Sequence, residues 1–398
     1  MVGPSRFLSL RAVELLVVAL VGAGLALGGA ALLGKLGDHT TTTVEQVTPS
    51  VLPTTSTTAA STKALTPEAI YRQDGPGVVQ ITATSVTQSA FLPATQTSKS
   101  QGSGFVLDRA GHIITNFHVI SGAQKVQVSF SGQDQLPATV VGKDRSTDLA
   151  VLKIDAHARA LTPLPLGDSS RVVVGEPVAA IGSPFGNENS LTVGVVSATQ
   201  RSIESLTSQY NLVDAIQVDA PINHGNSGGP LFDAAGRVIG INAQIRSDNG
   251  SAEGVGFAVP INAARRSMQE LVATGKVAYA YVGITSEDLT PGIARRYGYP
   301  VRSGAVITSV RPGSPGAHAG LRGGSQQRDF NGSAFTYGGD VVVSIGGSPV
   351  RSASDVVRAV TERLRPGQTV PVTVVRDGAR QTVQVTLANR PRNPDSGR

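Results

Sequence analysis

The sequence of 398 residues contains no cysteine and no tryptophan. Without cysteine, the chain has no disulfide framework, no thiol nucleophile and no cysteine-ligated metal. The absence of cysteine does not identify the cellular compartment, because a chain with a large core needs no disulfides outside the cytoplasm. Aromatic residues make up only 4%, and the positive charges behind the net charge of +6 are scattered along the chain. Both features argue against nucleic-acid binding.

Charged residues are also few, at 16%, whereas glycine is frequent, with 46 residues. This mixture is typical of turn-rich β structure rather than of long, salt-bridged helices. From about 67 to 259, short apolar runs rich in Val and Ile alternate with turn residues. The spacing predicts an all-β barrel or sandwich, because a βαβ sheet would need helical periods in between. The stretch is long enough for two small barrels side by side.

The character of the chain changes after this β-rich stretch. A helical pattern appears at 261–274, and Gly275 ends it. A smaller unit of mixed α and β follows up to about 390, with a second helical pattern at 354–364. Its last two strand-like runs predict a hairpin across Asp377-Gly378.

The N-terminus carries an uncharged apolar run of 19 residues, from Leu15 to Leu33. An ideal helix of this length spans about 28 Å, close to the hydrocarbon thickness of a bilayer. Because Arg6 and Arg11 precede the run, we expect the N-terminus to be cytoplasmic and the rest to be exported. An uncleaved membrane anchor is the main hypothesis. A cleaved signal peptide is the alternative, since small residues are plentiful around 28–31.

The segment after the apolar run is rich in Thr and Ser, with 10 Thr and 3 Ser among the 23 residues from Thr40 to Thr62. It lacks the apolar area that would offset its ordering entropy, so it predicts a disordered tether. The predicted domains are the cytoplasmic stub and transmembrane helix (1–37), the linker (38–66), the β-rich domain (67–274), the smaller domain (275–390) and a frayed tail (391–398).

Residues 223–230 read Asn-His-Gly-Asn-Ser-Gly-Gly-Pro. A serine nucleophile needs a sharp turn that exposes its hydroxyl, with backbone N–H groups aimed at the developing oxyanion. Glycines on both sides permit such a turn. A glycine-rich surface loop is the alternative, and GNSGG also matches the G-x-S-x-G pattern of α/β hydrolases.

Chain order decides between these alternatives. An α/β hydrolase places its acid and then its histidine after the serine. Here the only histidine after Ser227 is His318, which belongs to the smaller domain. Upstream, His118 ends the apolar segment HIITNFHVI, and Asp148 opens the strand-like DLAVLKI. The order His118, Asp148, Ser227 is that of the trypsin-like barrels, and these three residues are the predicted catalytic triad.

Five strings resemble signatures of the HtrA (Deg) serine proteases: GSGFVLD, ITNFHVI, STDLAVLKI, IGSPFG and GNSGGPL. They cover residues from about 100 to 260 in the order of the family. The resemblance implies a trypsin-like double β-barrel, with the active site in the crevice between the barrels. His118 is then expected to act as general base, and Asp148 to orient its ring.

The oxyanion hole and the specificity pocket are expected on either side of Ser227. Backbone N–H groups of Gly225 and Ser227, with Asn226 as a further candidate, would bind the oxyanion, and one such donor contributes about 3–4 kcal/mol in the transition state. By resemblance, the pocket is lined by the strand after the serine, with 245–256 as one wall. Its predicted residues are Ile241, Asn242, Ala243 and Gln244. No acidic residue is expected at its base, which favours small or medium aliphatic P1 residues.

Residues 276–390 resemble the PDZ domain that follows the protease in this family. Tyr281, Val282, Gly283 and Ile284 match its carboxylate-binding loop, which implies capture of peptide C-termini as an added strand. A PDZ domain that merely packs on the protease is the alternative. In this chain 17 residues separate Leu321 from Gly339, so we expect a polar insertion there, in a surface loop.

No metal and no cofactor is predicted, because His39, His112 and His157 form no ligand spacing with carboxylates. The family implies a homotrimer, with contacts from the segment before Gly102, including Phe91. The main functional hypothesis is an endopeptidase that degrades misfolded or damaged exported proteins. A chaperone or peptide-binding scaffold with latent activity, and a regulatory protease activated by C-terminal peptides, are the alternatives.

The two histidines near the predicted nucleophile can be separated by mutation. We expect His118→Ala to abolish peptide hydrolysis, because it removes the general base, and His224→Ala to retain it. Hydrolysis of an unfolded protein by each variant measures this. Loss of activity in His224→Ala alone would contradict the assignment.

Overall fold

The computed structural model describes residues 64–391, apart from 89–94, 132–134, 158–159, 184–188, 204, 206, 209, 224 and 244–254. The predicted membrane helix, nearly all of the linker and nearly all of the tail lie outside the described residues. Within the described part, no helix combines the length and the apolar composition that a membrane span needs.

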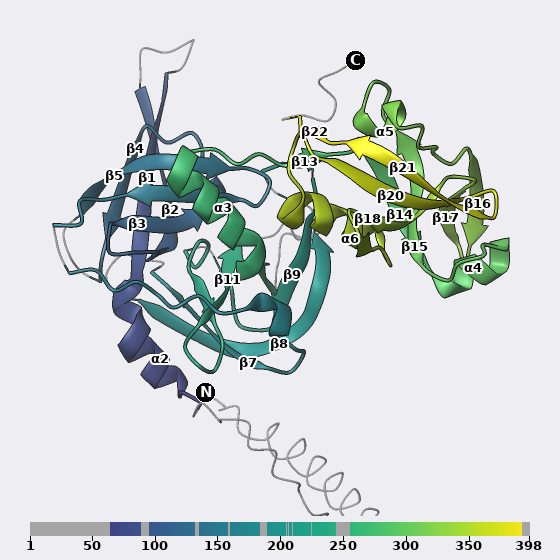
Figure 1. The fold of residues 1–398 in the computed structure, drawn as a ribbon. Coiled ribbons are helices and arrows are strands. Elements are labelled where there is room, and N and C mark those ends of the chain that lie inside the picture. Colours follow the sequence, from purple (N-terminus) through teal and green to yellow (C-terminus); the bar gives the residue numbers. More distant parts are fainter. Residues whose placement is uncertain are drawn as a thin grey trace, which may run out of the picture. The chain divides into compact units, whose positions relative to one another are not determined.

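Six antiparallel strands close into a first barrel, in the order β1-β2-β3-β6-β5-β4 (Figure 1). They are β1 (Val78–Gln88), β2 (Thr95–Val106), β3 (His112–Asn116), β4 (Lys125–Ser129), β5 (Leu136–Asp144) and β6 (Leu149–Lys153). Successive side chains of a strand point to opposite faces, so the branched apolar residues at every second position fill the interior. Val79, Ile81, Val106, Ile113 and Leu152 are all fully buried there.

A second closed barrel follows, in the order β10-β11-β12-β9-β8-β7. Its strands are β7 (Pro177–Gly182), β8 (Ser190–Ile203), β9 (Leu212–Val218), β10 (Pro230–Phe232), β11 (Val238–Ala243) and β12 (Gly256–Pro260). The prediction of two small barrels is therefore confirmed. Single-turn 3₁₀ helices lie at Gly75–Gly77, His118–Ile120 and Ser169–Arg171.

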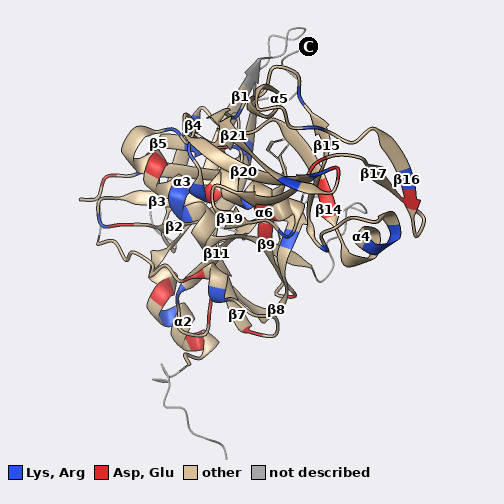
Figure 2. Cartoon of the chain, turned by 45° about the vertical axis from the view of Figure 1, so that its right-hand side comes forward, with Lys and Arg blue, Asp and Glu red and all other residues tan. Residues whose placement is uncertain are grey.

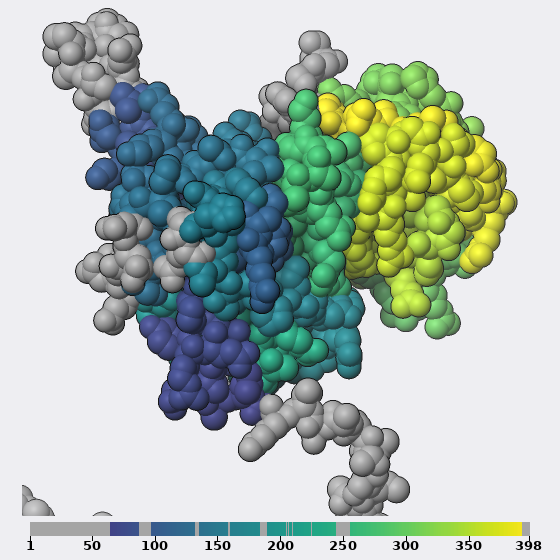
Figure 3. Space-filling model, turned by 60° about the vertical axis from the view of Figure 1, so that its left-hand side comes forward, coloured from purple at the N-terminus to yellow at the C-terminus, as the bar shows by residue number. Residues whose placement is uncertain are grey.

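Two α-helices flank the barrels. Helix α3 (Ile261–Thr274) has the predicted bounds, and Gly275 ends it with a left-handed φ of 71°. Met268 and Leu271 on its buried face join the core shared with the barrels, and α3 packs on β5 and β6 (Figure 3). Helix α2 (Pro67–Asp74) was not predicted; Thr66 caps its N-terminus by accepting a hydrogen bond from the Ala69 N–H.

The smaller domain is built on a five-strand path, β14-β15-β18-β20-β21, with β19 paired to β18. Its strands are β13 (Ala280–Tyr281), β14 (Ile284–Leu289), β15 (Gly304–Val310), β18 (Val341–Ile345), β19 (Ser348–Pro349), β20 (Thr369–Arg376), β21 (Ala379–Thr386) and β22 (Ala388–Asn389). The hairpin of β20 and β21 confirms the predicted turn, in which Asp377 and Gly378 both have positive φ.

The helices of this domain agree only partly with the sequence pattern. The pattern at 354–364 becomes α6 (Ala353–Arg358), followed by a π-helical turn at Ala359–Arg363. Ser352 and Asp355 form a capping box that starts α6 at Ala353, one residue before the predicted pattern. Two short helices were missed: α4 (Pro291–Tyr297) and α5 (Pro315–His318).

The expected surface loop between Leu321 and Gly339 is wrong: this segment forms a hairpin of β16 (Gln326–Phe330) and β17 (Ser333–Tyr337). The first half of the insertion is polar, which predicts a loop, but the aromatic residues of the second half supply apolar area that packs in the domain. The Phe335 side chain is buried and stacks on Tyr297 at 5.8 Å between ring centroids.

Charges of both signs are interspersed along the chain, as the composition indicates. In Figure 2, basic and acidic segments occur on the same helix at α2, which carries the exposed residues Glu68 and Arg72. Such mixed exposed charge contributes to solubility rather than to the fold.

One ion pair of the smaller domain is buried. Both oxygens of Asp340, which is 1% exposed, accept hydrogen bonds of 2.7 Å from Arg376. Asp340 also accepts from the Arg322 N–H, and Arg376 donates to Gly320 O. Because the carboxylate accepts its hydrogen bonds and adds its charge, the pKa of Arg376 is raised.

Asp340→Ala should therefore destabilise the smaller domain by about 3–5 kcal/mol, since it leaves a half-buried guanidinium unpaired. Urea unfolding of the full chain, followed through the transition of this domain, measures the loss. Glu68→Ala is the control, because it breaks an exposed pair with Arg72 and should change little. Equal effects of the two substitutions would contradict the structural role of Asp340.

Candidate active site

The first barrel supplies two of the three predicted triad residues. His118 follows β3 at the start of its 3₁₀ turn, and Asp148 closes the turn between β5 and β6. His118 Nδ1 lies 2.6 Å from Asp148 Oδ2, and the His118 N–H donates to Asp148 Oδ1 at 2.9 Å. An ionised carboxylate accepts only, so the proton of a neutral ring sits on Nδ1 and Nε2 is left as the base.

The backbone holds Asp148 in a rare conformation. Its φ of 54° is left-handed, which is uncommon for a residue other than glycine. Its carbonyl accepts from Asn116 Nδ2 and from the Phe117 N–H, both at 2.9 Å. The strand that leads to His118 therefore also fixes the residue that orients it.

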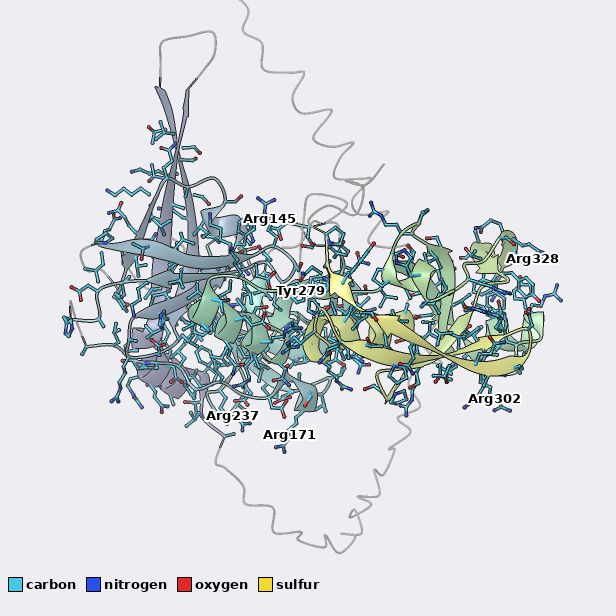
Figure 4. The ribbon with its side chains drawn as sticks, turned by 45° about the horizontal axis from the view of Figure 1, so that its top comes forward. Arg145, Arg171, Arg237, Tyr279, Arg302 and Arg328 are labelled. Atoms are coloured by element: carbon cyan, nitrogen blue, oxygen red, sulfur yellow. The ribbon has the colours of Figure 1, made fainter. Side chains whose placement is uncertain are left out.

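The turn that carries Asp148 is anchored by Asp144, which is 4% exposed. Asp144 Oδ2 accepts from Thr147 Oγ1 at 2.5 Å, from Ser267 Oγ of α3 at 2.7 Å and from the Tyr279 hydroxyl. Burial, with the Asp144 charge beside it, raises the pKa of Tyr279 well above its usual value. Figure 4 labels Tyr279 where α3 and the strands of the smaller domain come together. The segment that enters the smaller domain thus shares a hydrogen-bond network with the turn of Asp148.

The second barrel supplies Ser227, on the loop between β9 and β10. Gly225 and Gly228 have φ values of 103° and 86°, so a side chain at either would be strained. The turn is closed by hydrogen bonds from the Asn226 N–H to Asn223 O and from the Gly229 N–H to Asn226 O, both 3.0 Å. Ser227 Oγ is buried and makes no hydrogen bond in the part of the chain that the structure describes.

Two backbone donors on this loop are free. Among the described residues, the N–H groups of Gly225 and Ser227 donate to no backbone acceptor. The third candidate, Asn226, differs: its N–H is occupied, and its side-chain amide donates to Pro221 O at 3.4 Å. The free donors are thus two of the three predicted for the oxyanion hole.

The two halves of the triad meet where β2 crosses the nucleophile loop. The Ser103 N–H donates to Ser227 O at 2.8 Å. A Cβ on Gly228 would lie 2.5 Å from Thr115 Oγ1 and 3.0 Å from Asn116 N, two residues before His118. The structure thus brings all three residues to the contact between the barrels.

The predicted pocket residues Ile241, Asn242 and Ala243 lie on β11 and are buried. Asn242 holds the nucleophile loop: its carbonyl accepts from the Gly228 N–H at 2.8 Å, and its N–H donates to Gly229 O at 2.9 Å. Gln244 and most of the predicted wall lie outside the described residues.

The predicted peptide loop enters the smaller domain at one edge of its sheet, where β14 is the terminal strand. Val282 O accepts from the Gly316 N–H at 2.7 Å, and Gly283 O from the Arg311 N–H at 2.9 Å. The N–H groups of Val282 and Gly283 have no backbone acceptor among the described residues. The loop therefore offers free donors beside an open strand edge.

Comparison with known proteins agrees with this geometry. A trypsin-like peptidase domain model matches residues 102–241, and a PDZ domain model matches 280–387. Protease Do-like 1, chloroplastic, of Arabidopsis thaliana is 39% identical over 324 residues, which are 81% of this chain and 71% of that protein. The chain belongs to the HtrA (Deg) family of serine endopeptidases.

Other HtrA relatives support this membership. A probable periplasmic serine endoprotease DegP-like of Marinomonas sp. is 39% identical over 74% of this chain, which spans only 58% of that protein. The solved structure of the HtrA-type protease AlgW with tripeptide aligns with a TM-score of 0.67 and 33% identity, over 84% of this chain and all of that one.

Sequence reasoning missed several residues that hold the HtrA site together. Neither Asp144 nor Tyr279 lies within any of the recognised strings. Ser103 lies in the recognised string GSGFVLD, but a string does not show which of its atoms contact the nucleophile loop. Among the described residues, no group of three His, Cys, Asp or Glu side chains could hold a metal ion.

The fit of the nucleophile loop predicts the effect of Gly228→Ala. A Cβ at this position would lie 2.3 Å from Ser103 O, in addition to the strain of a left-handed residue. We expect hydrolysis to be lost and the urea midpoint to fall.

Gly122→Ala is the matched control, because Gly122 has a φ of 72° but nothing within 4 Å of the added atom. It should carry only the conformational cost of about 1–2 kcal/mol and keep its activity. Similar activities of the two variants would show that the loop has room to shift.

Proposed function

We propose that this HtrA chain is an extracytoplasmic endopeptidase that hydrolyses peptide bonds of misfolded or damaged exported proteins, through His118, Asp148 and Ser227. The observation that carries the proposal is the 2.6 Å contact from His118 Nδ1 to Asp148 Oδ2, together with free N–H donors on the loop of Ser227. Acyl transfer needs a histidine that carries its proton on Nδ1, so that Nε2 can act as the base. It also needs a nucleophile next to backbone N–H groups that are free to bind the oxyanion.

The proposed reaction follows from these positions. Ser227 Oγ attacks the scissile carbonyl while His118 Nε2 accepts its proton, and Asp148 stabilises the charged ring. His118 then gives the proton to the leaving amine, which departs and leaves an acyl-enzyme. A water molecule, deprotonated by His118, hydrolyses the ester and restores Ser227. No step calls for a metal or an organic cofactor.

The negative charge of the tetrahedral intermediate would be bound by the N–H groups of Gly225 and Ser227. Each such preorganised donor contributes about 3–4 kcal/mol to the transition state. Asn226 would act differently, by closing the turn through its hydrogen bond with Asn223. The apolar residues Ile241 and Ala243 on β11 support the preference for small or medium aliphatic P1 residues.

The smaller domain is proposed to bind the C-termini of peptides. The unpaired N–H groups of Val282 and Gly283 support capture of a carboxylate, and β14 offers an edge for an added strand. The HtrA-type protease AlgW has also been solved with a decapeptide, which favours peptide binding in this family.

The location and assembly are proposed from the sequence and the family. Several relatives are named as periplasmic endoproteases. The apolar run from Leu15 to Leu33 supports a single-pass anchor with the protease and PDZ domains outside the cytoplasm. The homotrimer follows from the family resemblance alone.

One observation favours a regulated form of this activity. Ser227 Oγ makes no hydrogen bond within the described residues. We therefore expect its hydrogen bond to His118 to form when substrate binds. This supports the second candidate function, a chaperone or peptide-binding scaffold with latent activity. A regulatory protease activated by C-terminal peptides is the third candidate, which the same experiment tests.

Digestion of a permanently unfolded protein by the full chain in detergent tests the proposal. The wild type should cleave it, and Ser227→Ala should lose nearly all cleavage, because the nucleophile is gone. Equal cleavage by the two would refute the assignment. An added peptide with a free C-terminus should raise the rate if the activity is latent, whereas its C-terminally amidated form should not.

A further inference from the structure

Ser103 on β2 contacts both residues that carry the free donors of the nucleophile loop. Its N–H donates to Ser227 O at 2.8 Å, and its hydroxyl donates to Gly225 O. Ser103 belongs to the first barrel, whereas Gly225 and Ser227 belong to the second. One residue of β2 therefore holds the carbonyl groups of both proposed oxyanion residues.

The direction of the Ser103 hydroxyl is fixed by a third contact. The N–H of Ser183, which follows β7, donates to Ser103 Oγ at 2.8 Å. Because this N–H can only donate, the Ser103 proton is left for Gly225 O. The Ser103 carbonyl accepts from Thr115 Oγ1 at 2.7 Å, and the residue is fully buried. Every polar group of Ser103 thus has a partner, and no solvent competes for them.

The loop also packs closely on β2 at the glycines on either side of these hydrogen bonds. A Cβ on Gly229 would lie 3.2 Å from Ser103 Cβ, and one on Gly102 would lie 3.1 Å from Ser227 O. The loop and β2 therefore approach too closely to leave ordinary van der Waals space for a side chain at either glycine. The strand therefore serves as a fixed base for the loop.

A loop of this composition needs an external restraint. Glycines before and after Ser227 have positive φ, and glycine peptides rotate more freely than others. Oxyanion donors act only when they are aimed at the charge before it develops. The two carbonyl contacts restrict the torsion angles around Gly225 and Ser227, and hence the directions of their N–H groups.

We infer that Ser103 is a positioning residue, whose buried hydroxyl holds Gly225 so that the oxyanion donors keep their catalytic geometry. The inference rests on the proposed roles of Ser227 and Gly225. It assigns a task to the string GSGFVLD that the triad and the PDZ domain leave unexplained.

Ser103→Ala in the full chain tests this inference, because it removes the hydroxyl and leaves the backbone contact to Ser227. We expect kcat for a peptide substrate to fall about 10- to 100-fold with KM within about twofold, since the restrained groups act in the transition state. Affinity for a peptide boronic acid, which forms a tetrahedral adduct, should fall by a similar factor.

Ser129→Ala is the matched control. Ser129 lies in the same barrel on β4 and is also buried, with 5% exposure, so the same atom is removed away from the loop. It should keep kcat and boronate affinity even if its urea midpoint falls. If Ser103→Ala changes only the urea midpoint, as Ser129→Ala does, the positioning role is wrong.

Two further variants separate the remaining outcomes. Ser103→Cys keeps a weak donor of similar size, so its kcat should lie between those of the wild type and Ser103→Ala. Should Ser103→Ala fail to fold, a wild-type kcat in Ser103→Cys would overturn the inference. An inactive Ser227→Ala beside a fully active Ser103→Ala would refute only the role of Ser103, whereas an active Ser227→Ala would refute the proposed function itself.

Discussion

The contact between β2 and the nucleophile loop is the constraint on which the site depends. His118 and Asp148 belong to one closed barrel and Ser227 to the other, so neither barrel holds a complete site. Closed barrels are rigid bodies with few free edges, and their relative position is fixed only where they touch. The hydrogen bonds from Ser103 to Ser227 and Gly225 lie at that contact. The geometry of the candidate site thus depends on how the two barrels pack on each other.

A second set of buried hydrogen bonds extends from the same region toward the smaller domain. Asp144 holds the turn of Asp148 and accepts from Tyr279, which precedes β13. The guanidinium of Arg390 lies over the ring of Tyr279, with 4.8 Å from Cζ to its centroid. Arg266 of α3 donates to Tyr279's neighbour Ala278 and to Thr361 of the smaller domain. These contacts connect the turn of Asp148 to the smaller domain through Asp144, Tyr279 and Arg266.

The elements that the sequence predicts well are those with strong local signals. Helix α3 has its expected bounds because an apolar face ends at Gly275, and the last hairpin turns at Asp377-Gly378 as expected. The insertion was wrongly predicted to be a loop, because the rings of Phe335 and Tyr337 pack on Tyr297 of α4, which is far away in the sequence. Short helices with Pro at the start, such as α2, offer too few turns for a visible period.

For the site, the sequence by itself determined the candidate triad, since chain order and residue type distinguish a trypsin-like arrangement from an α/β hydrolase. The sequence also determined that the loop can turn with positive φ at Gly225 and Gly228, because glycine adopts such values without strain. The tertiary structure alone decided which donors stay free and which residues restrain them. Ser103 and Asp144 act across 122 and 135 residues of chain, on Gly225 and Tyr279, and no local pattern records contacts at such separations.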